Sequence, residues 1–188
     1  MVGPRYGFFI EHKRSLEKRL GLEDLTIEKI QPRQLNPSYA APLEVFAFMV
    51  GHADWSALQG TPGDDCCHNA HLFTPPGWSG GDGQIVAVGY DFDLTGALNP
   101  PYGEPPLGLR SWRQRKFRGW CWDGNLIEEN VQLTLQLKGE IERDIMTEEH
   151  ASERRRKSMW DYLQGYFKII DNPKRKARLI TNDCRALP

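Results

Sequence analysis

Glycine and proline constrain this chain most, because they interrupt its middle so often that no long helix can form there. The 188 residues include 18 glycines and 13 prolines, and residues 94–110 alone contain four of these prolines and three of these glycines. Neither residue supports a helix interior, so we expect 94–110 to form an ordered but irregular loop with an extended backbone. The length of the chain suits a single domain over residues 1–188.

Two short helices are predicted before this irregular middle. The first covers residues 15–20, and Gly21 just past its end is a typical stop. The second covers residues 42–50, because Pro42 suits the first position of a helix and Gly51 follows the last apolar residue.

Two long helices are predicted in the last third of the chain. Residues 125–146 and 147–170 carry apolar side chains at helical spacing. Within the first, residues 131–137 also alternate between apolar and polar types, which suits a strand, but the length and the Glu-rich flanks favour a helix. Asn172-Pro173 ends the second helix, and residues 174–188 are expected to form a basic tail.

Three short apolar runs predict strands. Residues 6–10 are aromatic and β-branched, and residues 70–73 and 85–90 flank a linker rich in proline and glycine. The second and third runs are therefore expected to pair as a β-hairpin. Several helices with one small hairpin place the chain in the α+β class.

Charge and hydropathy restrict the classes of partner. Lys and Arg number 24 and Asp and Glu 25, so no overall field attracts nucleic acid or an anionic membrane. No run of about 18 apolar residues could span a membrane, and the N-terminus lacks the apolar segment of a signal peptide. We therefore expect a cytoplasmic protein without a membrane partner. Its four cysteines are expected to be reduced, since the adjacent Cys66 and Cys67 cannot readily bridge to each other.

Amide and acidic side chains gather around the predicted hairpin. Asn69 stands at the start of its first strand and Asp91 at the end of its second, so pairing brings them to the same rim. Asp54 lies in the polar loop before the hairpin. Oxygen ligands from Asp and Asn suit Mg²⁺, which takes its remaining ligands from water and phosphate. The sequence therefore predicts a metal site at this rim, with Asp54 as a free carboxylate beside it.

Three motifs in this region occur in an order found in a known superfamily. They are Gly51-His52-Ala53-Asp54, His68-Asn69-Ala70-His71-Leu72-Phe73 and Tyr90-Asp91-Phe92-Asp93. This block resembles the catalytic half of the protein-kinase-like superfamily, and most closely its spore-coat-protein kinase (CotH-like) branch and related uncharacterised bacterial proteins. In that branch an Asp closes a Gly-Asn-x-Asp pattern, a His-Asn pair precedes a short strand, and the next strand ends in aromatic-Asp-aromatic-Asp.

The resemblance implies a mostly helical kinase-like C-lobe with the metal site on its hairpin. Its activity would be ATP- and Mg²⁺-dependent phosphoryl transfer to a protein hydroxyl. Asp54 matches the catalytic-loop Asp of this family, which acts as the base, and Asn69 and Asp91 match its metal ligands.

Three further residues are expected to bind or support the cofactor by the same resemblance. His68 and Asp93 flank the two metal ligands in sequence, and Glu11 ends a stretch that resembles the hinge between the two kinase lobes.

The chain also departs from the family pattern. Kinase-like enzymes hold ATP between two lobes, under a glycine-rich loop and a strand Lys, whereas the first Lys here is Lys13, already past the hinge-like stretch. We therefore expect the N-terminal lobe to be absent or to be a separate subunit. His52 stands where the branch has Asn, and the long spacing from Asp54 to Asn69 requires residues 59–65 to loop out.

Three other interpretations stay open. A kinase-like lobe without its partner lobe could be a non-catalytic module that binds protein. Residues 110–122 interleave five basic residues with four aromatics, which suits single-stranded nucleic acid, although a helix edge with aromatics packed inward and Arg side chains facing outward is favoured. A zinc site is a minor alternative, because no Cys-x-x-Cys pair occurs among its candidate ligands, which are Cys66, Cys67, His68, His71 and Cys121.

Overall fold

Six helices and three strands make up the regular part of the computed structural model, which describes residues 11–63, 65–106 and 108–188. The helices are α1 (Lys13–Leu20), α2 (Pro37–Val50), α3 (Leu126–Gln136), α4 (Lys138–Thr147), α5 (Glu153–Ile170) and α6 (Pro173–Lys176). The strands are β1 (Glu23–Asp24), β2 (Ala70–Thr74) and β3 (Val86–Gly89), and short turns of 3-10 helix (Pro32–Gln34) and π-helix (Ala177–Thr181) complete the set. The α+β class is confirmed, and the predicted strand at 6–10 lies outside the described residues.

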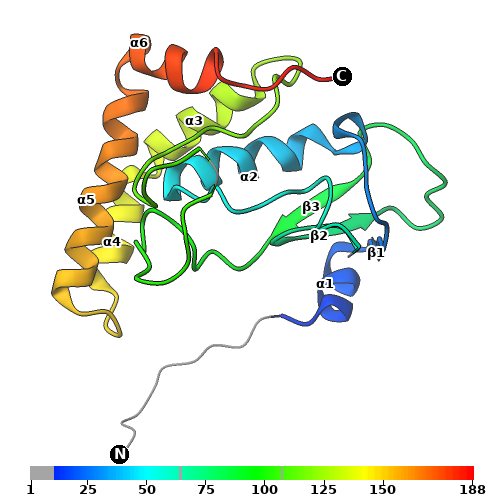
Figure 1. Cartoon of the computed structure of the whole chain (residues 1–188), viewed down its shortest axis with the longest axis horizontal. Coiled ribbons are helices and arrows are strands. Elements are labelled where there is room, and N and C mark those ends of the chain that lie inside the picture. Colours follow the sequence, from blue (N-terminus) through cyan, green and yellow to red (C-terminus); the bar gives the residue numbers. More distant parts are fainter. Residues whose placement is uncertain (1–10, 64, 107) are drawn as a thin grey trace, which may run out of the picture.

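Helix α2 runs between the small sheet and the other long helices (Figure 1). Toward α3 and α5 it contributes to one apolar core, and toward β2 and β3 it contributes to a second. Among its side chains, Val45, Phe48 and Met49 belong to the first core, and Ala40 and Ala47 to the second. Because both of its faces are buried, α2 fixes the position of the sheet relative to the helical half.

The ends of α2 follow local capping rules. The Asn36 side chain accepts a hydrogen bond from the Ser38 backbone N–H at 3.0 Å, and Pro37 occupies the first helical position. The predicted start at Pro42 was therefore wrong, because Asn36-Pro37 already supplies a cap and a first residue. The predicted end is confirmed: Gly51 adopts φ +72°, and a side chain there would collide with Tyr162.

The sheet has the order β1-β2-β3, and both of its strand pairs are antiparallel. Strands β2 and β3 pair Ala70 with Gly89 and Phe73 with Val86, which confirms the predicted hairpin. In this register the backbone N–H of Tyr90 donates to the carbonyl of Asn69 at 3.0 Å. The start of β2 and the end of β3 therefore meet at one rim of the sheet.

The last third is helical, with boundaries that differ from those expected. The predicted helix over 125–146 divides at Leu137 into α3 and α4, and the predicted helix over 147–170 begins only at Glu153. Ser152 caps α5 by accepting a hydrogen bond from the Arg155 backbone N–H. The described residues include no helix with the length and apolar character needed to cross a membrane.

The C-terminal segment expected to be a basic tail packs against the rest of the fold. Ile180 is buried, and Lys176 forms an ion pair with Glu128 of α3 at 2.7 Å. A disulfide joins Cys184 to Cys121, and Cys66 is joined to Cys67. The structure thus corrects the expectation that all four cysteines are reduced.

A carboxyl group lies buried on α2. Glu44 is 3% exposed and accepts hydrogen bonds from Trp122 Nε1 at 2.8 Å and from the Trp120 backbone N–H at 3.3 Å. Burial raises the pKa of Glu44 to about 8, although both hydrogen bonds and the charge of Arg185 oppose this shift. Glu44 is therefore mostly protonated in the folded protein at neutral pH.

The raised pKa of Glu44 predicts that the folded state weakens as pH rises. In the unfolded chain the group ionises near 4.5, while the folded protein keeps the proton until about 8. The stabilisation that protonated Glu44 provides is therefore fully present below the pKa of the unfolded chain, and it is lost as the pH rises through the pKa of the folded protein. The resulting change in the free energy of unfolding is on the order of 4 kcal/mol. Urea denaturation should show the unfolding free energy of the wild type falling relative to Glu44→Gln between about pH 5 and about pH 8. A difference that stays constant with pH would contradict this.

Candidate functional site

The loop that follows α2 lies against the segment that leads into β2. Ser56 and His68 exchange two backbone hydrogen bonds, of 2.9 and 3.1 Å. This short antiparallel contact brings the loop of Asp54 to the start of the hairpin. Within the stretch 59–65 that was expected to loop out, residues 61–63 form a bend and a turn, whereas Gln59 forms an antiparallel bridge with Lys29.

Asp54, the predicted catalytic base, contacts both residues of the His-Asn pair. The Nε2 atom of His68 lies 3.1 Å from Asp54 Oδ1, and Asn69 Nδ2 donates to the Asp54 backbone carbonyl at 2.7 Å. The Asp54 side chain is 29% exposed, so its carboxylate remains reachable from solvent. Three of the predicted site residues therefore form one contact group.

Asn69 and Asp91 both adopt a left-handed backbone, with φ of 55° and 54°. This conformation is uncommon for residues other than glycine, and Asn and Asp tolerate it best. It makes both residues sharp bends at the ends of their strands. Since the Asn69 amide nitrogen donates to Asp54, the side-chain oxygen Oδ1 remains as the atom that could bind a cation.

Asp91 lies near two other carboxyl groups. Desolvation raises the pKa of Asp91, and the carboxyl of Asp93 and, more weakly, the charge of Asp54 raise it further. The Tyr102 hydroxyl donates to Asp93 Oδ2 at 3.1 Å. Asp91 therefore lies within electrostatic reach of both Asp93 and Asp54.

The turn that carries Asp91 and Asp93 is fixed against the end of α2. The backbone N–H groups of Gly96 and Ala97 donate to the carbonyls of Gly51 and Val50 at 3.1 and 3.0 Å. These bonds hold the two acidic residues beside the loop of Asp54.

His52 is a site-supporting residue whose role the sequence left undefined. It is 2% exposed, and its ring lies 5.0 Å from the ring of Phe92, the residue that separates Asp91 from Asp93 in the sequence. Burial lowers the pKa of His52, which favours a neutral ring. The His52-x-Asp54 spacing, combined with an aromatic residue between two acids, is the sequence signal for this packing.

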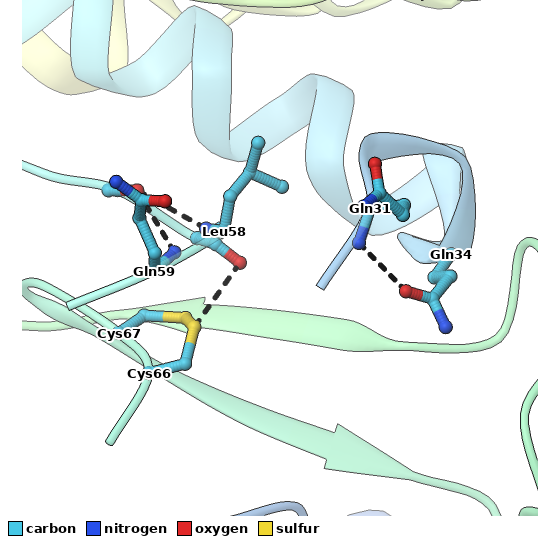
Figure 2. The surroundings of a disulfide bond; sticks show 8 residues. Gln31, Gln34, Leu58, Gln59, Cys66 and Cys67 are labelled. Atoms are coloured by element: carbon cyan, nitrogen blue, oxygen red, sulfur yellow. Dashed lines mark hydrogen bonds between the residues drawn. A yellow bond between two sulfur atoms is a disulfide. The ribbon is translucent and has the colours of Figure 1, made fainter. Parts of the chain in front are cut away.

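The Cys66–Cys67 pair lies directly before the His-Asn motif and beside the segment of Leu58 and Gln59 (Figure 2). The Cys66 backbone N–H donates to the Ile27 carbonyl at 2.7 Å, and Cys66 Sγ lies 3.8 Å from the Ala57 carbonyl oxygen. The hydrogen bond holds the start of the motif against the segment that follows β1, and the sulfur lies beside the loop that follows Asp54. Because its thiols are joined, the pair does not offer the thiolates that the zinc alternative requires.

Glu11 is not placed with this group. Its carboxylate accepts hydrogen bonds of 2.7 and 3.2 Å from the guanidinium of Arg19 on α1, and this pairing lowers the pKa of Glu11. Its partner thus lies on α1, and the hinge-like stretch before it falls outside the described residues.

The basic and aromatic segment 110–122 packs inward without forming a helix. Trp112 and Phe117 are buried, and the Arg115 guanidinium lies 3.7 Å above the Tyr162 ring and donates to backbone carbonyls, those of Phe48, Met49 and Tyr162. Buried aromatics are confirmed for Trp112 and Phe117, whereas the expected helix was wrong, and so was the outward direction expected for the Arg115 side chain. Arg115 serves the packing of α2 against α5.

Two variants of Asn69 separate its hydrogen bond from its backbone conformation. Asn69→Gly and Asn69→Ala both lose the donor to the Asp54 carbonyl, but only alanine also resists the left-handed backbone. We expect Asn69→Ala to be less stable than Asn69→Gly by about 1 kcal/mol, as measured by urea denaturation. Equal stability, or a more stable alanine variant, would show that position 69 does not need this conformation.

The comparisons with known proteins identify no similar protein. Among the described residues, no three His, Cys, Asp or Glu side chains gather as a metal-binding group. No protein-family model, curated protein or solved structure matches the chain.

Proposed function

We propose that this chain carries the catalytic residues of an ATP- and Mg²⁺-dependent phosphotransferase that acts on a protein hydroxyl. The observation that carries the proposal is the convergence of Asp54, Asn69 and Asp91 at one rim of the hairpin. Asn69 donates to the backbone of Asp54, and its own carbonyl accepts the N–H of Tyr90, the residue before Asp91. Phosphoryl transfer needs such an acid and such metal ligands side by side.

Asn69 Oδ1 and the Asp91 carboxylate would hold the metal ion. Both offer the hard oxygen atoms that Mg²⁺ prefers, and Mg²⁺ in phosphate-transfer sites commonly takes only one or two protein carboxylates, with phosphates and water as its other ligands. When bound, Mg²⁺ would neutralise charge on the transferred phosphoryl group. The exposed side chain of Asp91 leaves room for those further ligands.

Asp54 would orient the acceptor hydroxyl and accept its proton. His68 lies against Oδ1 of the carboxylate, which leaves Oδ2 for the hydroxyl hydrogen. The His68 contact fixes this carboxylate and the Asn69 contact fixes the backbone of Asp54 before the substrate arrives, so little reorganisation is needed during transfer.

Kinase-like enzymes cover the ATP phosphates with a glycine-rich loop and a strand Lys. Lys13 is occupied in an ion pair with Asp24 at 3.1 Å, so it is a poor substitute for the strand Lys of kinase-like enzymes. The non-catalytic protein-binding module is the function that would remain if no transfer occurs.

Transfer of the terminal phosphate from radiolabelled ATP to a protein acceptor tests the proposal. We expect Asp54→Asn and Asp91→Asn to lower the initial rate by at least about 100-fold, because one removes the proton acceptor and the other a metal ligand. Removal of Mg²⁺ with a chelator should have a similar effect.

Asp82→Asn is the matched control, since Asp82 is an exposed acid in the turn of the same hairpin. It should label the acceptor at the wild-type rate, and circular dichroism should show all variants folded. Labelling by the wild type that equals that of folded Asp91→Asn contradicts the proposal.

A further inference from the structure

A hollow of about 470 Å³ lies beside the loop that carries Asp54. Its lining includes the residue directly before Asp54, and three basic side chains stand among apolar ones. The residues that line it include Ala53, Lys116, Phe117, Arg118, Asp183 and Arg185.

Two arginines line this hollow, and the charge of Asp54 acts on one of them, Arg118. Within the part of the chain that the structure describes, neither Arg118 nor Arg185 forms an ion pair; Arg118 donates to the Ala53 carbonyl, and Arg185 lies 4.0 Å above the Trp120 ring. Each guanidinium carries five N–H donors, so most of these remain available. Lys116, by contrast, is neutralised by Asp183 at 2.8 Å.

The two guanidinium charges also repel each other. Desolvation lowers the pKa of both groups, and the charge of Arg118 lowers that of Arg185 further. Glu44 acts electrostatically on Arg185, but it is mostly protonated at neutral pH. An anion between the two arginines would remove this repulsion, and the planar guanidinium suits the paired oxygens of phosphate and carboxylate.

We propose that this hollow binds an oxyanion, a phosphate or carboxylate group, that the acceptor protein carries close to the hydroxyl to be phosphorylated. The hollow and the candidate catalytic acid share one loop, since Arg118 holds the carbonyl of Ala53 next to Asp54. A group bound there lies within one short stretch of acceptor chain from the reacting hydroxyl. The role in acceptor choice rests on the proposed phosphotransferase function, whereas binding of the oxyanion does not.

Binding of inorganic phosphate tests the hollow without any assay of activity. Calorimetric titration at constant ionic strength should show saturable binding to the wild type, and Arg185→Gln should raise the Kd at least about tenfold. Arg118→Lys keeps the positive charge but loses the planar guanidinium with its paired N–H donors. It should therefore weaken binding less than Arg118→Gln.

Arg110→Gln is the matched control, because Arg110 is an exposed arginine in the same segment that does not line the hollow. It should bind phosphate as the wild type does. The proposal is overturned by the absence of saturable binding, or by a Kd that stays unchanged in folded Arg185→Gln and Arg118→Gln.

Acceptor peptides distinguish this inference from the proposed function. Peptides with Asp, Glu or phosphoserine beside the acceptor hydroxyl should have a lower KM than a neutral peptide, and Arg185→Gln should remove this preference. An active Arg185→Gln variant that keeps the preference overturns the inference alone. Arginine-dependent phosphate binding by an inactive chain supports the oxyanion site and overturns only the transferase proposal.

Discussion

The hydrogen bond from Asn69 to the backbone carbonyl of Asp54 joins the two halves of the candidate site. One half is the loop after α2, and the other is the rim of the β2–β3 hairpin. With the Ser56–His68 backbone contact beside it, this 2.7 Å bond holds the predicted acid next to the predicted metal ligands. It also uses the nitrogen of the Asn69 amide and so leaves its oxygen for other partners.

Helix α2 supports the same site through two buried polar side chains, one within the helix and one just past its end. Glu44 holds Trp120 and Trp122 near the basic hollow, and His52 packs against Phe92 of the acidic turn. Burial favours the neutral form of both groups, so neither is an uncompensated charge in the interior. The acidic rim of the hairpin and the hollow with its two arginines both lie beside the Asp54 loop, and both therefore depend on α2.

Short-range patterns made part of this fold predictable. Antiparallel pairing of two adjacent apolar runs forces the start of one strand to meet the end of the other, so the meeting of Asn69 and Asp91 at one rim follows from the sequence. The stops at Gly21 and Gly51 were also predictable, because glycine adopts the left-handed conformation that ends a helix.

Features that depend on distant partners were not predictable from local patterns. The break at Leu137 lies two residues before Gly139, which itself belongs to α4, and the pairing of Cys121 with Cys184 spans 63 residues. Likewise, the local sequence does not determine whether an Arg side chain faces solvent or donates to carbonyls in the interior, as that of Arg115 does. Glu11 was expected at the cofactor, but a nearby arginine on α1 provides its partner.

The central claim is that segments distant in sequence form one cation site at the hairpin rim, and Mn²⁺ titration followed by nuclear magnetic resonance tests it most directly. Mn²⁺ accepts the same oxygen ligands as Mg²⁺ and broadens the signals of nearby amides. Substoichiometric Mn²⁺ should broaden the amide signals of Asp54, Asn69 and Asp91 before others, and Asp91→Asn should abolish this selectivity. Selective broadening elsewhere, or none at the rim, would contradict the account.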